Sequence, residues 1–481
     1  MRWRYVLNVI GLLTLFSGLT MLAPLWVGVF FDDASVLPLS MAIGVALLFG
    51  LVLHLAFRRV KVEVLTPREA MAIVALGWVA IGAFGALPFL LGMDLAPVDA
   101  VFESVSGFTT TGSTILTDIE SVPKGLLFWR SQTQWLGGMG IIVLSIAILP
   151  FLKLGGMQLY KAEVPSPVPD RLRPHIRDTA KVLWKVYALF TLVQVLLLLL
   201  GGMSLFDAFC HAFTTMPTGG YSTWNASVAR FDSLYIDVVV MVFMLLAGIN
   251  FSLHYLMVKG RPLAFWRDTE CRFFLGFVLA ATAVVAWDIY GTVYESLGVA
   301  LRYASFQVVS IVTTTGYATA DYELWPGASQ LILLLCMFVG ASAGSTGGGM
   351  KCLRVIVALK YCYRELFLLL HPHAVSRVKL SGKAVSEDVV RSVIGFLALY
   401  VGLFAAGIVL VAGTGVDFTT AIGSVAATLG NIGPGFGSVG PTENFAHLPE
   451  TAKWILIWCM LLGRLEIYTL LILIVPEFYR K

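Results

Sequence analysis

The chain has 481 residues, of which 58% are hydrophobic and only 13% are charged, with a net charge of +4 and a mean hydropathy of +0.85. Soluble domains carry about 25% charged residues, so this composition excludes an ordinary soluble protein and predicts a polytopic membrane protein. The small net charge gives no reason to expect nucleic-acid binding. The six scattered cysteines, without CxxC or His/Cys clusters, indicate neither a disulfide framework nor a zinc site.

Two apolar stretches open the chain. Residues 1–30 carry Arg2 and Arg4 and then run apolar over a length sufficient to cross ~30 Å of hydrocarbon. That run is longer than the apolar core of a signal peptide, and no clear small-x-small cleavage site follows it, so a first membrane helix is the favoured interpretation. Residues 37–57 form the second predicted span, and residues 1–60 make a leading pair of helices.

Four related stretches organise the rest of the chain. Each starts like a short helix and ends in a glycine turn: FESVSGFTTTGST (102–114), FCHAFTTMPTGGYST (209–223), FQVVSIVTTTGYAT (306–319) and the more distant GSVAATLGNIGPGFG (423–437). In each stretch one residue stands ten positions before a turn glycine: Phe102 before Gly112, Phe209 before Gly219, Phe306 before Gly316, and Gly423 before Gly433. The chain is therefore predicted to contain one unit repeated four times.

Each repeat is predicted to hold a span, a half-helix, a turn and a second span. The repeats are assigned to residues 61–160, 161–260, 261–380 and 381–481. In the order span, half-helix, turn and second span, the first repeat has 69–91, 99–109, 110–114 and 130–152, and the second has 182–200, 206–216, 217–221 and 234–258. In the same order, the third repeat has 271–288, 302–313, 314–317 and 328–359, and the fourth has 390–411, 419–429, 430–436 and 453–475. The whole is an all-α membrane protein with about ten transmembrane spans.

The half-helices are too short to cross a bilayer. They must enter and leave on one side, which is tolerated only where protein or water covers their irregular backbone. Asp99, Asp207 and Asp417 stand just before the half-helices, where helix capping is the first interpretation of their role.

Threonine and glycine at these turns suit a cation. Glycine adopts backbone angles that let consecutive carbonyls point to one side, and threonine hydroxyls add further oxygens. Four such turns around one axis would replace the hydration shell of an alkali ion, as carbonyl rings do in potassium channels. A half-helix ending at each turn would direct the negative end of its dipole at the ion. A single Thr-Gly turn is an ordinary loop, so the prediction depends on the four matched copies.

Basic residues predict the orientation. The assigned loops place 27 of the 33 Lys and Arg residues on one side, including both termini. The opposite side would hold Lys124, Arg130, Arg230, Arg302 and Lys453. The positive-inside rule assigns the first side to the cytoplasm, so both termini are expected there and the turns open outward.

The last span of the third repeat is interrupted by GASAGSTGGGMK at residues 340–351. Each of its five glycines disfavours a helix by ~1 kcal/mol relative to alanine, so an unwound segment is expected at membrane depth, where it would mark an ion pathway. A gate beneath the third turn is the favoured interpretation, and close helix packing from Gly340 to Gly344 is the alternative. The candidate gate residues are Gly344, Ser345, Thr346, Gly347, Gly348, Gly349 and Lys351.

Arg464 lies within the last predicted span. A central arginine costs about 2.5–3.5 kcal/mol to insert, so its side chain is expected to face the protein interior. It would either donate to free carbonyls of the glycine-rich segment or form a positive barrier beneath the turns. A local pair with Glu466 is the less favoured alternative, because residues two apart point to different faces of a helix.

These motifs together resemble one known family. The turns, FWRSQTQWLGGMGIIVLSIAILP (128–150), GGMQLYKAEVPSPVPDRLRP (155–174), GSTGGGMK (344–351) and GRLEIYTLLIL (463–473) are similar to the TrkH family. Its members are the membrane subunits of bacterial Trk potassium uptake systems, in a superfamily with KtrB and plant HKT transporters. The resemblance covers almost the whole chain, and the leading helix pair favours TrkH over KtrB.

The resemblance implies four helix–pore–helix repeats around one pore, in a homodimer, with potassium bound in a filter and no other cofactor. Glycine in all four turns argues for potassium, since relatives with serine at the first-turn glycine tend to pass sodium. The fourth turn departs from Thr-Thr-Gly and makes the filter asymmetric. The filter residues carried over are Thr110, Thr111, Gly112, Thr218, Gly219, Gly220, Thr314, Thr315, Gly316, Asn431, Ile432 and Gly433.

The family also implies a cytosolic, TrkA-like ring of nucleotide-binding subunits and a place in the bacterial inner membrane among its lipids. The chain itself has no Walker motif and no G-x-G-x-x-G after a predicted strand. Gated uptake of potassium and rubidium is thus the expected function. The alternative is a proton- or sodium-coupled symporter, although acids within the predicted spans are few, with Glu466 the main one. The sequence shows no cluster of candidate catalytic side chains, so an enzyme is not expected.

Overall fold

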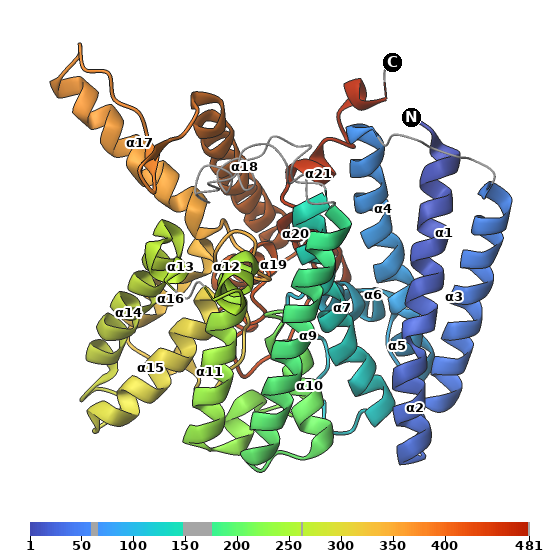
Figure 1. The fold of residues 1–481 in the computed structure, drawn as a ribbon. Coiled ribbons are helices and arrows are strands. Elements are labelled where there is room, and N and C mark those ends of the chain that lie inside the picture. Colours follow the sequence, from blue (N-terminus) through green and yellow to red (C-terminus); the bar gives the residue numbers. More distant parts are fainter. Residues whose placement is uncertain (59–65, 148–175, 261–262, 480–481) are drawn as a thin grey trace.

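The computed structural model describes residues 1–58, 66–147, 176–260 and 263–479, and Figure 1 shows them as a bundle of helices with short helices at its centre. Two short strands, β1 (Lys379–Leu380) and β2 (Lys383–Ala384), pair as an antiparallel hairpin. The basic motif at 155–174 and the predicted repeat boundaries at 60/61 and 160/161 lie outside the described residues. The predicted all-α architecture is confirmed for the described part of the chain.

The leading pair lies at one side of the bundle (Figure 1). Helices α1 (Trp3–Thr20) and α2 (Leu22–Phe31) follow one another as a single apolar stretch, and α3 (Val36–Phe57) packs along α1. Gly50 allows the close approach, because a Cβ there would lie 2.8 Å from the carbonyl oxygen of Gly11. Small residues at the contact bring the two backbones together, as in other membrane helix pairs.

The first helix of each repeat is long and apolar. These helices are α4 (Pro67–Gly85) continued by α5 (Leu87–Gly92), α9 (Ile176–Leu200), α14 (Thr269–Ile289) and α18 (Glu387–Ala412). With the leading pair, they give six stretches among the described residues that are long and apolar enough to cross a membrane. Six of the ten predicted spans are therefore confirmed as spans by length and composition.

The second helix of repeats two, three and four is broken. Helix α11 (Leu234–Gly248) bends by 102° into α12 (Phe251–Val258). Helix α16 (Gly327–Val339) is separated from α17 (Cys352–Leu370) by the glycine-rich segment, as predicted. Helix α20 (Glu450–Arg464) gives way to the single turn of α21 (Tyr468–Leu471).

Two of these breaks correct the predictions of continuous helices at 234–258 and 453–475. In the first, Asn250 caps α12 by accepting a hydrogen bond from the backbone N–H of Ser252. In the second, Glu466 and Ile467 have positive φ angles of 60° and 54°, which a right-handed helix cannot contain.

The second helix of repeat one, α7 (Lys124–Ala147), begins six residues before its predicted start at 130. Arg130 was assigned to the outer side with the loops, but it lies inside α7 with only 2% of its surface exposed. The polar sequence RSQTQ (130–134) was predicted to begin this span, and the structure buries it in α7. The predicted continuation of this span beyond residue 147 lies outside the described residues.

The half-helices are α6 (Pro97–Phe108), α10 (Leu205–Thr215), α15 (Leu297–Val312) and α19 (Phe418–Leu429). Asp417 caps α19, as predicted, by accepting from the Thr420 N–H. The other two capping predictions are wrong, since Ser204 caps α10 and Asp99 instead accepts a hydrogen bond from Lys453 Nζ at 2.6 Å. The remaining short helices are α13 (Ala264–Arg267), η1 (Ser227–Phe231), η2 (Tyr322–Leu324) and η3 (Pro476–Phe478).

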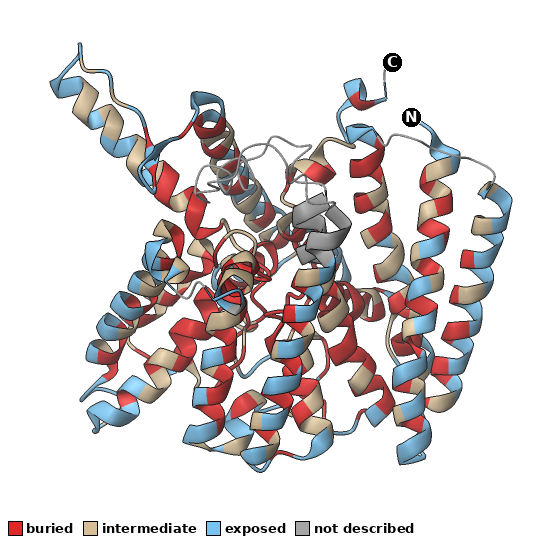
Figure 2. Ribbon diagram, in the orientation of Figure 1, coloured by how far each residue is buried: buried red, intermediate tan, exposed pale blue. Residues whose placement is uncertain are grey.

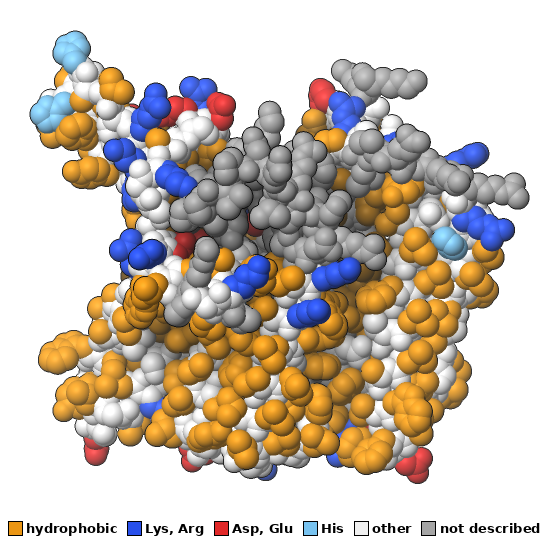
Figure 3. All heavy atoms as spheres, in the orientation of Figure 1, with side chains coloured by type: hydrophobic (Ala, Val, Ile, Leu, Met, Phe, Trp, Pro, Cys, Tyr) orange, Lys and Arg blue, Asp and Glu red, His pale blue; other side chains and the backbone are white. Residues whose placement is uncertain are grey.

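Burial and charge follow this arrangement. Buried residues gather toward the centre of the bundle, whereas exposed residues are most frequent on the outer helices (Figure 2). The face seen in Figure 3 carries a broad hydrophobic area, with most of its Lys and Arg side chains toward the end where both termini lie. A surface of this kind suits a protein surrounded by lipid hydrocarbon.

Candidate functional site

The four half-helices end in the same backbone geometry. At the first end, the Thr110 N–H donates to the Gly107 carbonyl and the Thr111 N–H donates to the Ser106 carbonyl. Equivalent pairs of hydrogen bonds, spanning three and five residues, occur in the other repeats at Thr218 and Gly219, Thr314 and Thr315, and Asn431 and Ile432. This is the Schellman ending of a helix.

The first residue of each turn is in the left-handed region. The φ angles are 51° at Thr110, 58° at Thr218, 59° at Thr314 and 54° at Asn431. Asparagine tolerates this region, but threonine is β-branched and is an outlier there. Residues in such conformations cluster at functional sites, where the surrounding structure holds them in place.

A glycine with positive φ follows two residues later in every repeat, with values of 88° at Gly112, 74° at Gly220, 81° at Gly316 and 110° at Gly433. This register corrects the ten-residue rule for the second repeat. Gly220, not Gly219, matches the other turn glycines, so Cys210 takes the place that was predicted for Phe209. The carried-over residues Thr218, Gly219 and Gly220 nevertheless occupy equivalent positions in the second turn.

The four turns form a closed ring. A Cβ on Gly112 would lie well under 3.0 Å from the carbonyl oxygen of Gly219. In the same way, one on Gly220 would meet the Thr315 oxygen and one on Gly316 would meet the Ile432 oxygen. The ring closes at Gly433, where an added Cβ would lie 3.1 Å from the Thr111 carbonyl oxygen. Each turn therefore touches the next in chain order, and glycine is needed for that approach.

Two buried side-chain oxygen atoms of the turn residues have no hydrogen-bond partner among the described residues. They are Thr110 Oγ1 and Asn431 Oδ1, and both residues are fully buried. Buried polar atoms are normally paired, so the Thr110 hydroxyl fits a site that receives an ion or water. The Asn431 side chain lies behind the turn, where its Nδ2 donates to Thr111 Oγ1 and to the Met460 carbonyl. The Thr111 hydroxyl also lies behind the turn, 2.7 Å from that of Thr109, and Thr315 repeats this contact with Thr313 at 2.8 Å.

The glycine-rich segment at 340–351 lies against the half-helix ends of three repeats. Thr346 Oγ1 donates to the Met216 carbonyl at 3.0 Å. The Gly348 N–H donates to Thr314 Oγ1 at 2.6 Å, and the Gly349 N–H donates to the Gly430 carbonyl at 3.0 Å. The predicted segment is therefore unwound and sits directly at the ring.

Two buried cations hold this segment. Arg464 Nη1 donates to the Thr346 carbonyl at 2.7 Å, which confirms the predicted contact, and Lys351 Nζ donates to the Gly347 carbonyl. Glu466 pairs with Arg354 rather than with Arg464. Arg464 Nε and Nη2 have no partner among the described residues, so this buried guanidinium keeps unused donors beside the segment.

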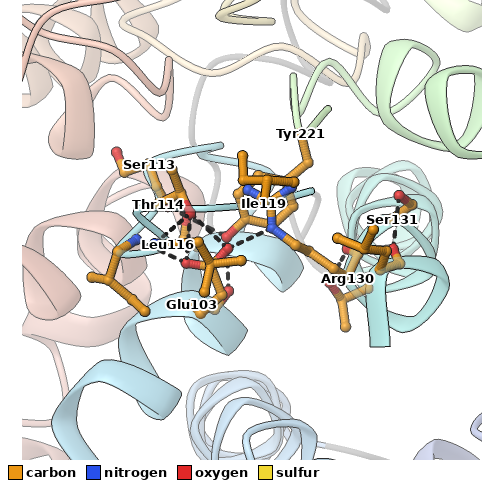
Figure 4. A network of polar contacts seen from close by, with 12 residues as sticks. Glu103, Ser113, Thr114, Leu116, Ile119, Arg130, Ser131 and Tyr221 are labelled. Atoms are coloured by element: carbon orange, nitrogen blue, oxygen red, sulfur yellow. Dashed lines mark hydrogen bonds and ion pairs between the residues drawn. The ribbon is translucent and has the colours of Figure 1, made fainter. Parts of the chain in front are cut away.

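Several residues that support the site were not predicted from the sequence. Glu270 Oε1 accepts from the N–H groups of Ala343 and Leu353 and so ties the two limbs of the segment together. Glu103 and Arg130 form a buried ion pair beside the first turn (Figure 4). Gln134, one helical turn after Arg130, contacts the second turn. The spacing of Arg130 and Gln134 was the available signal, since residues four apart share a helix face.

Comparisons with known proteins agree with this geometry. The family model TrkH, described as a cation transport protein, matches residues 40–479. The Trk system potassium uptake proteins TrkH of Halomonas elongata and Salmonella typhimurium are 43% and 44% identical to this chain, with all of each chain covered. These relatives are named as transport proteins and not as enzymes, in line with the prediction.

A solved structure gives the same result. The crystal structure of the potassium transporter TrkH from Vibrio parahaemolyticus is similar with a TM-score of 0.93 and 39% identity, and the match covers the full length of both chains. The chain therefore belongs to the TrkH family of cation transport proteins.

Proposed function

We propose that this chain carries potassium, and also rubidium, across the bacterial inner membrane through the ring of four turns. The observation that supports this most is the closed contact of each turn glycine with the neighbouring turn. Such a ring gathers backbone carbonyls from four repeats, which is how a filter replaces the hydration shell of an alkali ion. Each half-helix also ends at the ring, where the negative end of its dipole favours a cation.

Glycine in every turn supports potassium over sodium as the preferred ion. Because side chains at Gly112, Gly220 and Gly316 would overlap neighbouring carbonyls, the ring keeps one geometry without side-chain interference. Potassium bound at the twelve carried-over residues is then the transported ion and not a resident cofactor. The names of the relatives, which are potassium uptake proteins, agree with this choice.

The glycine-rich segment is proposed as the gate. Its hydrogen bonds to Thr314 and to the Met216 and Gly430 carbonyls would have to break before the inner side of the ring opens. Arg464 and Lys351 stabilise the closed arrangement by donating to its carbonyls, and they add positive charge beneath the ring.

A cytosolic, TrkA-like ring that binds nucleotide is the proposed regulator, and a homodimer is the proposed assembly. Both termini are proposed to lie in the cytoplasm, and the basic side chains toward the end where the termini lie support this orientation (Figure 3). Light scattering of the detergent-solubilised protein tests the dimer, and a monomer would contradict it. A protease that removes terminal tags only in inside-out vesicles tests the orientation.

Uptake of radioactive rubidium into proteoliposomes of the purified chain tests the function. A potassium gradient drives uptake, and external potassium or sodium competes with it. Block by potassium but not by sodium is expected. Equal block would reduce the ring to a general alkali-cation site, and uptake driven by a pH gradient at zero voltage would favour the coupled symporter instead.

A further inference from the structure

The half-helices carry one polar residue at a matched position behind the ring. Nine residues before the turn glycine stand Glu103, His211, Gln307 and Ser424. The first three reach the outgoing limb of their own turn: Glu103 binds Thr114, His211 Nε2 lies 3.1 Å from Ser222 Oγ, and Gln307 donates to the Ala320 carbonyl. Of the four, only the residue in the first repeat carries a carboxylate.

Glu103 holds the outgoing limb of the first turn with several hydrogen bonds. Its carboxylate accepts from Thr114 Oγ1 and from the Ile115 N–H, each at 3.0 Å, and its side chain is fully buried (Figure 4). A buried carboxylate needs a countercharge, which Arg130 of α7 supplies at 2.6 Å.

Arg130 extends this contact to the second repeat. Its Nη1 donates to the Ser222 carbonyl at 2.8 Å, and its guanidinium carbon lies 3.5 Å from the centre of the Tyr221 ring. The Tyr221 hydroxyl donates back to the Glu103 carbonyl at 2.9 Å. The outgoing limbs of turns one and two are therefore joined through one buried ion pair.

Gln134 holds the second turn from the same face of α7. Its Nε2 donates to the Gly219 carbonyl at 2.8 Å, and its Oε1 accepts from the Tyr221 N–H at 3.1 Å. The second turn has glycine where turns one and three have Thr111 and Thr315, and Gln134 fills the space that a side chain would take. The Gly219 oxygen is also the atom that Gly112 approaches, so Gln134 positions the contact between the two turns.

We propose that Glu103, Arg130 and Gln134 form a brace that sets the ion preference of the ring by fixing turn two against turn one. This inference rests on the proposed potassium conduction. The three are positioning residues, because they act through the Gly219 carbonyl and the outgoing limbs. Without them, the carbonyls of turns one and two shift relative to one another, and the ring loses its fit to potassium more than its ability to pass cations.

Two variants and a matched control test the brace. Gln134→Leu keeps the approximate volume but removes both hydrogen bonds. The double variant E103L/R130M replaces the ion pair by apolar side chains, which avoids leaving one buried charge unpaired. D237L/R302M removes a comparable ion pair, whose atoms are 2.7 Å apart between α11 and α15, away from the ring. Rubidium uptake is measured with sodium and potassium as competitors.

Both brace variants are expected to lose about tenfold in the potassium-to-sodium preference, which is the order of magnitude that one lost hydrogen bond produces. The control variant should keep the preference of the unmodified chain. A purely structural role would lower the yield of folded protein in all three variants and leave the preference unchanged. An unchanged preference in the folded brace variants would overturn the proposal.

The unmodified chain separates this proposal from the function itself. If it shows no preference for potassium, the proposed function fails first. If the unmodified chain prefers potassium, an unchanged preference in the brace variants refutes only the brace and leaves the proposed function standing. The rise in unfolding temperature with added potassium or sodium chloride gives a second measure that does not need an open gate. A potassium-specific rise that is retained in both brace variants would also refute the brace.

Discussion

Gly316→Ser is the sharpest test of the ring. The new Cβ would lie well under 3.0 Å from the Ile432 carbonyl oxygen and 2.8 Å from Pro434 Cδ, and real Cβ atoms essentially never come closer than 3.0 Å. The neighbouring turn must therefore move. The φ angle of 81° adds strain, since a non-glycine residue in the left-handed region costs about 1–2 kcal/mol.

Strain of about 1–2 kcal/mol corresponds to a factor of about 5–30 in an equilibrium. We expect the potassium-to-sodium preference of rubidium uptake to fall by a factor in that range, because the Ile432 carbonyl is displaced from the ring. Gly415→Ser is the matched control, since its φ of 95° brings comparable strain but its Cβ would meet no atom within 4 Å. Retained preference in folded Gly316→Ser protein, or an equal loss in both variants, would refute the assignment of the ring.

Three further predictions concern the gate and the leading helices. Shortening residues 344–349 removes contacts to the half-helix ends, each worth about 1 kcal/mol, so rubidium flux should rise about tenfold; unchanged flux in folded protein would remove the gate. Arg464→Leu loses a charge-assisted hydrogen bond to the Thr346 carbonyl, worth about 1.5–3 kcal/mol, and should also raise rubidium flux in the same vesicles. The preference for potassium should stay the same. Lower flux in folded protein would contradict the closing role of Arg464. Gly50→Leu would overlap Gly11 and should lower stability by about 1–3 kcal/mol in thermal unfolding; a lost ion preference there would contradict the separation of the leading pair from the ring.

Local signals in the sequence were sufficient for much of the fold. Apolar length predicts the leading pair and the first helix of each repeat, because crossing hydrocarbon depends on composition. The half-helices and the break after Val339 follow from glycine and threonine placed at helix ends, where backbone preference acts within a few residues. The turns were located from the four matched copies of the motif, and their individual ion-binding residues were carried over from the resemblance to the TrkH family.

Other features depend on contacts between distant parts of the chain. Asn250 and Glu466 lie in apolar stretches that would continue as helices in isolation, and their breaks form because the glycine-rich segment and Arg354 offer partners there. The second-turn register is set by Gly220 meeting Thr315, which lies in another repeat.

The polar face of α7 shows the difference most clearly. RSQTQ (130–134) is strongly polar, and its burial becomes favourable only because Glu103, Gly219 and Ser222 from two half-helix turns supply hydrogen-bond partners. Composition and backbone preference therefore specify which segments enter the membrane and where the turns lie. The pairing of buried polar groups across repeats specifies how those turns are held, because each group needs a partner that is remote in the sequence.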